Sequence, residues 1–86
     1  MELGFTIDYT PEAIEMMDDR MILKSDVTRV LQSLRETGEA ILDEETGLIV
    51  TRARLGNVTF WVKFTETDTG YLVHRAYSHR MTIQTR

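Results

Sequence analysis

Residues 58–65 read Val-Thr-Phe-Trp-Val-Lys-Phe-Thr and alternate between two sets of side chains. Successive side chains of a β-strand point to opposite faces of a sheet, so the two valines and two phenylalanines share one face. That face must be covered by other parts of the chain. The stretch therefore predicts a strand with one buried face and one open face, and the open face carries Trp61 and Lys63.

Strands and turns are indicated on both sides of this stretch. Gly56-Asn57 before it and a turn ending at Gly70 after it are typical of short connections between antiparallel neighbours. Residues 3–9 also alternate and predict a further short strand at the N-terminal end. Four strands in meander order follow in the second half of the chain, with predicted ranges of 40–43, 48–55, 58–65 and 71–78.

A first helix is predicted from Pro11 to about Met21. Thr10 is a suitable N-cap, and proline is favoured at the first helical position because its missing N–H needs no partner there. The spacing of the apolar side chains predicts an inner stripe that packs on the sheet. This stripe consists of Ala13, Ile14, Met17 and Met21.

A second helix is predicted to begin at Ser25 and Asp26, which are typical N-cap residues. Its apolar positions follow the i, i+3, i+4, i+7 pattern, and Gly38 can close it in a left-handed conformation. We therefore expect one α+β domain over residues 1–86. It contains a short N-terminal strand, a two-helix hairpin and a four-stranded antiparallel meander, with the helices packed on one sheet face.

The charge is divided unevenly along the chain. The net charge of the whole sequence is −4, but residues 1–49 carry −8 and residues 50–86 carry +4. Uniform binding to nucleic acid is disfavoured because it normally needs a basic surface, and we expect no DNA partner. The basic β half leaves RNA, an acidic protein or self-association as possible partners.

Several classes of chemistry are disfavoured by what the sequence lacks. It has no cysteine, which excludes disulfides, thiolate metal sites and thiol nucleophiles. No apolar run approaches the roughly 20 residues that span a bilayer, so we expect no membrane association and a cytoplasmic location. His74 and His79 are five residues apart, which places them on opposite faces of a regular strand. We therefore predict no metal and no cofactor.

The open sheet face is the main candidate for function. Depending on register, Arg52, Arg54, Arg75 and Tyr77 can join Trp61 and Lys63 there. Guanidinium groups bind phosphates and carboxylates, and aromatic rings stack on bases, so this surface suits phosphate, RNA or an acidic protein. Solvated charges around a tryptophan that covers the core are the alternative. The full candidate binding set is Arg52, Arg54, Trp61, Lys63, Arg75, Tyr77, His79 and Arg80.

Residues 74–81 contain both histidines, two arginines, a tyrosine and a serine. His74 or His79 could act as a general base or acid near neutral pH, with a nearby arginine stabilising an anionic transition state. No carboxylate partner for either histidine is fixed by spacing. Catalysis at this segment therefore stays a hypothesis, with surface or interface roles as the alternative.

Residues 9–78 resemble the RelE-like and BrnT-like small-protein fold, especially its non-toxin relatives. The resemblance rests on Asp19-Arg20-Met21-Ile22, Ser25-Asp26-Val27, Val30-Leu31, the strands 48–55 and 58–64, and a last strand ending in Ala76-Tyr77. Toxins of that fold are ribonucleases with Arg, Lys, Tyr or His on the sheet face. The residues this implies here are Arg52, Arg54, Lys63, Arg75, Tyr77 and His79.

Two functions are consistent with these features. The first is a small cytoplasmic interaction module or accessory subunit that docks a protein partner, or a second copy, through its basic sheet face and C-terminal segment. The second is an endoribonuclease of the RelE-like kind. The acidic helical half would repel RNA over much of the surface, which favours the first.

Overall fold

The structure is a computed structural model that describes residues 4–80, with the side chain of Arg80 outside the description. It contains two helices and five strands, as the sequence predicts. In chain order these are β1 (Thr6–Tyr9), α1 (Pro11–Arg20), α2 (Lys24–Thr37), β2 (Ile41–Asp43), β3 (Leu48–Leu55), β4 (Val58–Glu66) and β5 (Gly70–Arg80).

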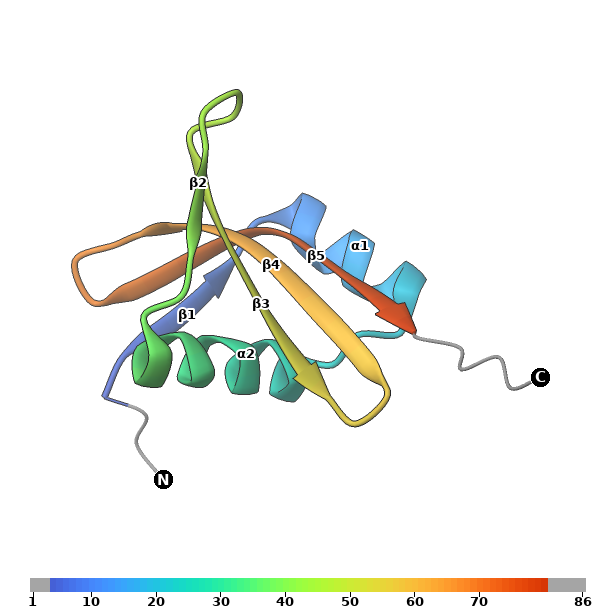
Figure 1. Ribbon diagram of the computed structural model, residues 1–86. Helices are drawn as coiled ribbons and strands as arrows, with labels where there is room; N and C mark the ends of the chain where they lie inside the picture. Colours follow the sequence, from blue (N-terminus) through green and yellow to red (C-terminus); the bar gives the residue numbers. More distant parts are fainter. Residues whose placement is uncertain (1–3, 81–86) are drawn as a thin grey trace.

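The five strands form one mixed sheet in the order β1-β5-β4-β3-β2. The predicted antiparallel meander is confirmed for β2 to β5. β1 adds to the far side of β5 in parallel, with Thr6 opposite Gly70 and Tyr9 opposite Val73. Figure 1 shows α2 running beneath the sheet, while the β2–β3 hairpin rises away from the body of the molecule.

The hydrophobic core lies between the sheet and the two helices. Val62 and Phe64 of β4 are almost completely buried, which confirms that the apolar side of residues 58–65 is the covered one. Figure 1 shows α1 beside the second half of β5, whereas α2 packs under β3 and β4. The buried core residues are Ala13, Met17, Ile22, Val27, Val30, Leu31, Val62, Phe64, Tyr71, Val73 and Ala76.

The helix ends confirm some sequence signals and correct one. The hydroxyl of Thr10 accepts a hydrogen bond from the Ala13 N–H, as expected of an N-cap. Gly38 closes α2 in the left-handed conformation. However, α2 begins one residue before Ser25, and Leu23 is its N-cap. Asp26 instead accepts a hydrogen bond from the Leu23 N–H over 3.0 Å, so its carboxylate satisfies the helix start from the third helical position.

Met21 does not belong to the inner stripe of α1, contrary to the prediction. It follows the last residue of the helix with φ of 57° and is 86% exposed, because the chain turns here into α2. Ile22, the next residue, is buried in its place. The left-handed turn rotates the chain direction, so helical spacing no longer decides which side chain faces the core.

Met21→Gly is expected to raise the free energy of unfolding by about 0.5–1 kcal/mol. A left-handed conformation costs an L-residue about 1–2 kcal/mol, and the greater freedom of glycine in the unfolded chain offsets part of this gain. Met21 buries almost nothing, so little packing is lost. Urea unfolding of the two proteins measures the difference, and an unchanged or lower stability would contradict this account of the turn.

Within residues 4–80, no helix is both long enough and apolar enough to cross a membrane.

Candidate functional site: the open face of the sheet

The sheet face opposite the helices, called the outer face below, brings most of the predicted binding residues together. Three cross-strand rows define it, because the register places partners on β3, β4 and β5 directly opposite one another. The first row is Arg52–Trp61–Tyr77, the second is Arg54–Thr59–His79, and the third is Val50–Lys63–Arg75. Arg80 is opposite Val58, and its side chain lies outside the described part.

The first row forms a layered stack on the central strands. The rings of Trp61 and Tyr77 are nearly parallel, with an interplanar angle of 11° and centroids 6.1 Å apart. The guanidinium carbon of Arg52 lies 5.3 Å from the Trp61 ring centroid, which is cation–π distance. Arg52 and Tyr77 approach from strands on opposite sides of β4. Trp61 therefore has a neighbour at each side and is held in one orientation.

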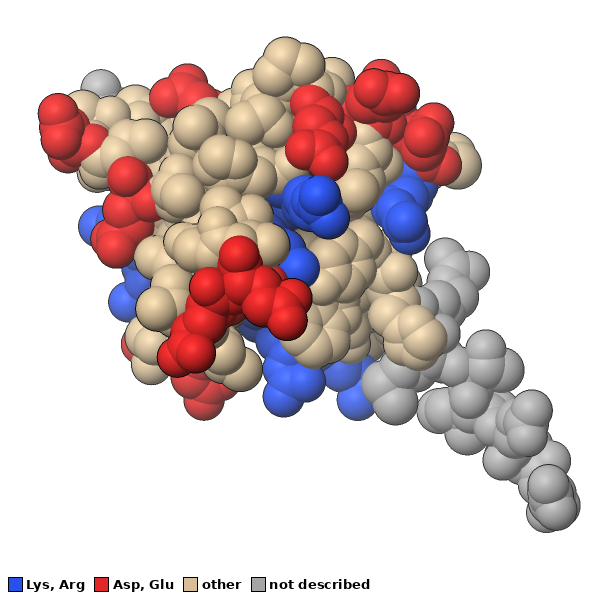
Figure 2. All heavy atoms as spheres, turned by 90° about the horizontal axis from the view of Figure 1, so that it is seen from above, with Lys and Arg blue, Asp and Glu red and all other residues tan. Residues whose placement is uncertain are grey.

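Two basic residues of the third row are paired with carboxylates. Lys63 lies 3.6 Å from Asp43 of β2, and Arg75 lies 3.4 Å from Glu12 of α1. In Figure 2, which views the molecule from above Figure 1, Asp and Glu lie directly against Lys and Arg at several places. The outer face is thus a mixed surface with exposed arginines, and not an unbroken basic patch.

Asp43 has a pKa below its ordinary value. Partial desolvation acts to raise this pKa, but the backbone hydrogen bond from Glu45, the Thr46 side chain and the charge of Lys63 together outweigh it. A carboxyl whose folded pKa is lowered stabilises the fold at pH values above its unfolded pKa. This stabilisation is lost as the pH falls through the folded pKa.

Lys63→Met is expected to raise the pKa of Asp43, because it removes a positive charge and keeps the aliphatic stem. The carboxyl carbon shift of Asp43, followed by NMR across the acid range, measures the change. The same titration of Asp8 is the control, since Asp8 lies at the opposite edge of the sheet on β1. An Asp43 midpoint that stays the same in Lys63→Met would show that the ion pair does not hold this carboxylate.

Arg54 and His79 lie at the two ends of the second row, and both are exposed. The Nε of Arg54 donates to the carbonyl of Gly56 over 3.1 Å, and the side chain is exposed. Arg52 and Arg54 are two residues apart on β3 and so point to the same side. They form the exposed cationic pair of the outer face.

The predicted separation of the two histidines onto opposite faces is wrong. A β-bulge inserts His74 between Val73, which is opposite Phe64, and Arg75, which is opposite Lys63. The extra residue changes the alternation, and the His74 Nε2 lies 3.1 Å from the Thr65 hydroxyl, on the same face as Lys63. His79 is also on this face, but it is opposite Thr59. Thr59 and Thr65 are six residues apart on β4, a separation of roughly 20 Å.

The histidines therefore do not form a common centre. Within residues 4–80, no group of three or more acidic or histidine side chains could hold a metal ion. Neither histidine contacts a carboxylate among the described residues. The hydrogen bond of His74 with Thr65 instead ties the bulge to β4.

A groove of about 420 Å³ lies beside the first row. Trp61 and Arg52 form one side of it, and Ile41 with the preceding chain forms the other. Ile41 is 73% exposed although it is apolar. Ile41 is not among the binding residues predicted from the sequence. The signal that could have identified it is the Ile41-Leu42 pair in a very short strand between acidic residues. The complete lining is Gly38, Glu39, Ala40, Ile41, Val50, Thr51, Arg52 and Trp61.

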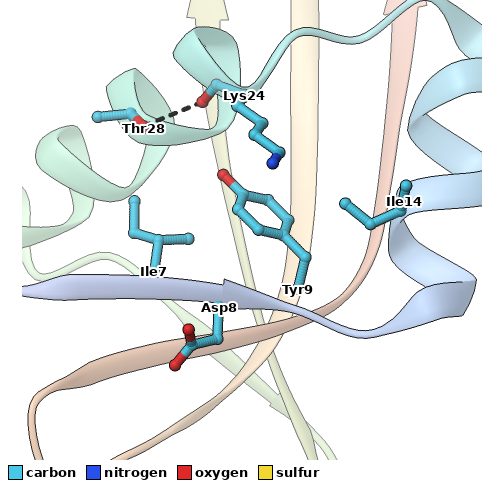
Figure 3. A pocket seen from close by; sticks show the side chains of 6 residues that line it. All are labelled: Ile7, Asp8, Tyr9, Ile14, Lys24 and Thr28. Atoms are coloured by element: carbon cyan, nitrogen blue, oxygen red, sulfur yellow. Dashed lines mark hydrogen bonds between the residues drawn. The ribbon is translucent and has the colours of Figure 1, made fainter.

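A second cavity, of about 540 Å³, lies where β1 meets the two helices. Figure 3 shows the Tyr9 ring pointing toward α2 between Ile7 and Ile14, while Asp8 points away. The Lys24 ammonium lies 5.3 Å from the ring centroid of Tyr9, and burial raises the pKa of the Tyr9 hydroxyl, with the Thr28 side chain opposing this in part. These contacts join the helix starts to β1, and none of the predicted binding residues lies here.

Comparisons with protein-family models, with curated proteins and with solved structures give no match. The structure supports a small α+β fold with two helices and a five-stranded mixed sheet. The geometry of the outer face is therefore the basis for assigning a function.

Proposed function

We propose that this protein is a small interaction module that docks an acidic protein segment on the outer face of its sheet. The observation that carries the proposal is the Arg52–Trp61–Tyr77 stack beside an open groove. Trp, Tyr and Arg are the residue types that dominate binding energy at protein interfaces. Here all three are held by neighbours before any partner arrives, which lowers the entropic cost of binding.

The charges on this face define the chemistry of the partner. Lys63 and Arg75 are already paired with carboxylates, whereas Arg52 and Arg54 present exposed guanidinium groups. A segment with two or more Asp or Glu residues can bind both arginines through charge-assisted hydrogen bonds. An apolar side chain of the same segment fits the groove between Trp61 and Ile41.

Affinity capture from an extract of the native host tests the proposal. Wild-type protein is expected to retain a protein whose binding is lost with Arg52→Glu and with Trp61→Ala. Reversal of the Arg52 charge repels the acidic segment, and loss of the indole removes one wall of the groove. Loss of a buried aromatic anchor typically weakens binding by about 2–4 kcal/mol, or roughly 30-fold or more.

Arg29→Glu is the matched control, because Arg29 is an exposed arginine of α2, on the helical side of the sheet. It changes the net charge as Arg52→Glu does, but away from the outer face. Retention that is equal in Arg29→Glu and Arg52→Glu, or no retained protein at all, would contradict the proposal.

The endoribonuclease alternative has less support. Lys63 and Arg75 are opposite each other beside Tyr77, which is a suitable cluster for a phosphate. However, both are engaged by carboxylates, and the neighbours Arg52 and Tyr77 on either side of Trp61 restrict the stacking of a base on its ring. If expression of wild-type protein slows growth or cleaves RNA and an Arg75→Ala, His79→Ala pair does not, the ribonuclease function gains the advantage.

Membership of the RelE-like and BrnT-like group is likewise a proposal. Its support is the order of elements, in which two helices precede an antiparallel meander. An antitoxin-like gene encoded next to this one would strengthen it, and a neighbouring enzyme subunit would favour the accessory role.

A further inference from the structure

The outer edge of β2 is an apolar strand edge without a partner among residues 4–80. β2 is the last strand of the sheet and pairs only with β3. Ile41 and Leu42 are 73% and 60% exposed and point to opposite faces of the sheet. Edge strands are normally protected by charged side chains or by a covering element, because their free backbone groups attract other strands. Figure 1 shows the turn end of the β2–β3 hairpin rising away from the helices.

The charges around β2 oppose its pairing with a second β2. Glu39 precedes the strand, and Glu44 and Glu45 follow it, all of them exposed. Because these acids flank both ends of the three-residue strand, pairing with a second β2 would bring like charges close together, which destabilises such a pair. The edge therefore favours an added strand that is apolar in its middle and basic at its ends.

Residues 80–86 of this chain, Arg-Met-Thr-Ile-Gln-Thr-Arg, have this composition. Met81 and Ile83 alternate with polar residues, as in a strand that presents one apolar side. Arg80 and Arg86 are six residues apart, and so are Glu39 and Glu45. With Ile83 opposite Leu42, the basic ends of this stretch would face the acidic flanks of β2 in either strand direction.

The geometry requires that the added strand come from another molecule. Arg80 is three strands away from β2, about 14 Å at the usual spacing. Along the strand direction, Ile41 is level with Val50 of β3, whereas Arg80 is level with Leu55 of β3. These two levels are five residues apart, which adds about 17 Å to the distance. Six residues extend at most about 20–22 Å, so residues 81–86 would be used up in reaching β2 of their own molecule.

We propose that residues 81–86 of one copy add as an extra strand to the β2 edge of a second copy. Main-chain hydrogen bonds to the edge supply the association, and the contact of Ile83 with Leu42 sets its register. Residues 52–55 of β3 extend beyond the pairing with β2, but they carry Arg52 and Arg54 and so repel a basic strand. β1, the edge strand on the other side of the sheet, lacks the exposed apolar side chains of β2. This inference goes beyond the docking of an acidic partner on the outer face and does not depend on it.

Sedimentation equilibrium of the full chain tests the proposal. Wild-type protein is expected to self-associate, and Leu42→Lys and Ile83→Glu are each expected to weaken the association by at least about tenfold. Leu42→Lys places a positive charge against a basic strand, and Ile83→Glu places a negative charge against an acidic edge. Leu42 is exposed, and circular dichroism melts check that both variants stay folded.

A mixture of the two variants is the decisive sample. Leu42→Lys keeps an unchanged C-terminal segment, and Ile83→Glu keeps an unchanged β2 edge. The mixture is therefore expected to form a heterodimer, although each variant alone does not associate. A wild-type chain that stays monomeric, variants that associate like wild type, or a mixture that stays monomeric would each overturn the proposal. Trp61→Ala separates it from the proposed function, because this variant should lose partner capture and keep self-association.

Discussion

Phe64→Ala is expected to lower the free energy of unfolding by about 3–5 kcal/mol. Phe64 is 1% exposed and packs edge-on against Tyr71, with ring centroids 5.0 Å apart. Tyr71 in turn packs edge-on against Phe5, at 5.5 Å, so the ring of Phe64 supports a chain of aromatic contacts that reaches the start of β1. A domain of 86 residues has a total stability of roughly 4–13 kcal/mol, and the substitution removes a large share of it.

Urea unfolding followed by tryptophan fluorescence measures this loss. Phe64→Leu is the matched control, because it keeps part of the apolar volume and should cost clearly less than Phe64→Ala. Losses of similar size in both variants would show that the shape of the ring matters more than the volume it fills. A loss below about 1 kcal/mol in Phe64→Ala would contradict its place at the centre of the core.

Gly70→Ala is expected to detach β1 from the sheet, with a loss of about 3 kcal/mol or more. A Cβ at this position would overlap the backbone carbonyl oxygen of Thr6 and lie 2.6 Å from its nitrogen. Neither strand can move away without breaking the parallel pairing of Thr6–Tyr9 with β5. Amide hydrogen exchange should therefore show lost protection over β1 together with the fall in stability.

Thr69→Ala is the control for this prediction. It removes only the exposed hydrogen bond between the Thr69 and Thr6 hydroxyls, 2.7 Å long, and should cost about 1 kcal/mol or less. If Gly70→Ala leaves the protection of β1 intact, the close parallel contact described here is wrong.

Local patterns were sufficient to predict the helices and the meander. Alternation in residues 58–65 identified the buried side of β4, and Thr10-Pro11 identified the start of α1, because each depends only on neighbours in sequence. The parallel pairing of β1 with β5 could not be predicted in this way. It joins residues more than 60 positions apart and depends on the packing of Phe5, Ile7 and Tyr9 against the core.

The candidate site was predictable in composition but not in arrangement. Residue types indicated a basic aromatic face, and the register then stacked Arg52, Trp61 and Tyr77 in one row. The bulge at His74 has no glycine or proline to announce it, so the alternation failed there. The pairing of Arg75 with Glu12 was also hidden, since it depends on where α1 lies beside β5.

Photo-crosslinking in the native host tests whether the outer face is the docking surface. A benzophenone amino acid replaces Thr59, which lies next to Trp61 on β4 and between Arg54 and His79 in the second row. The same amino acid in place of Arg29 on α2 is the control. A defined protein adduct is expected from position 59 and none from position 29. No adduct from position 59, or the same adduct from both positions, would contradict it.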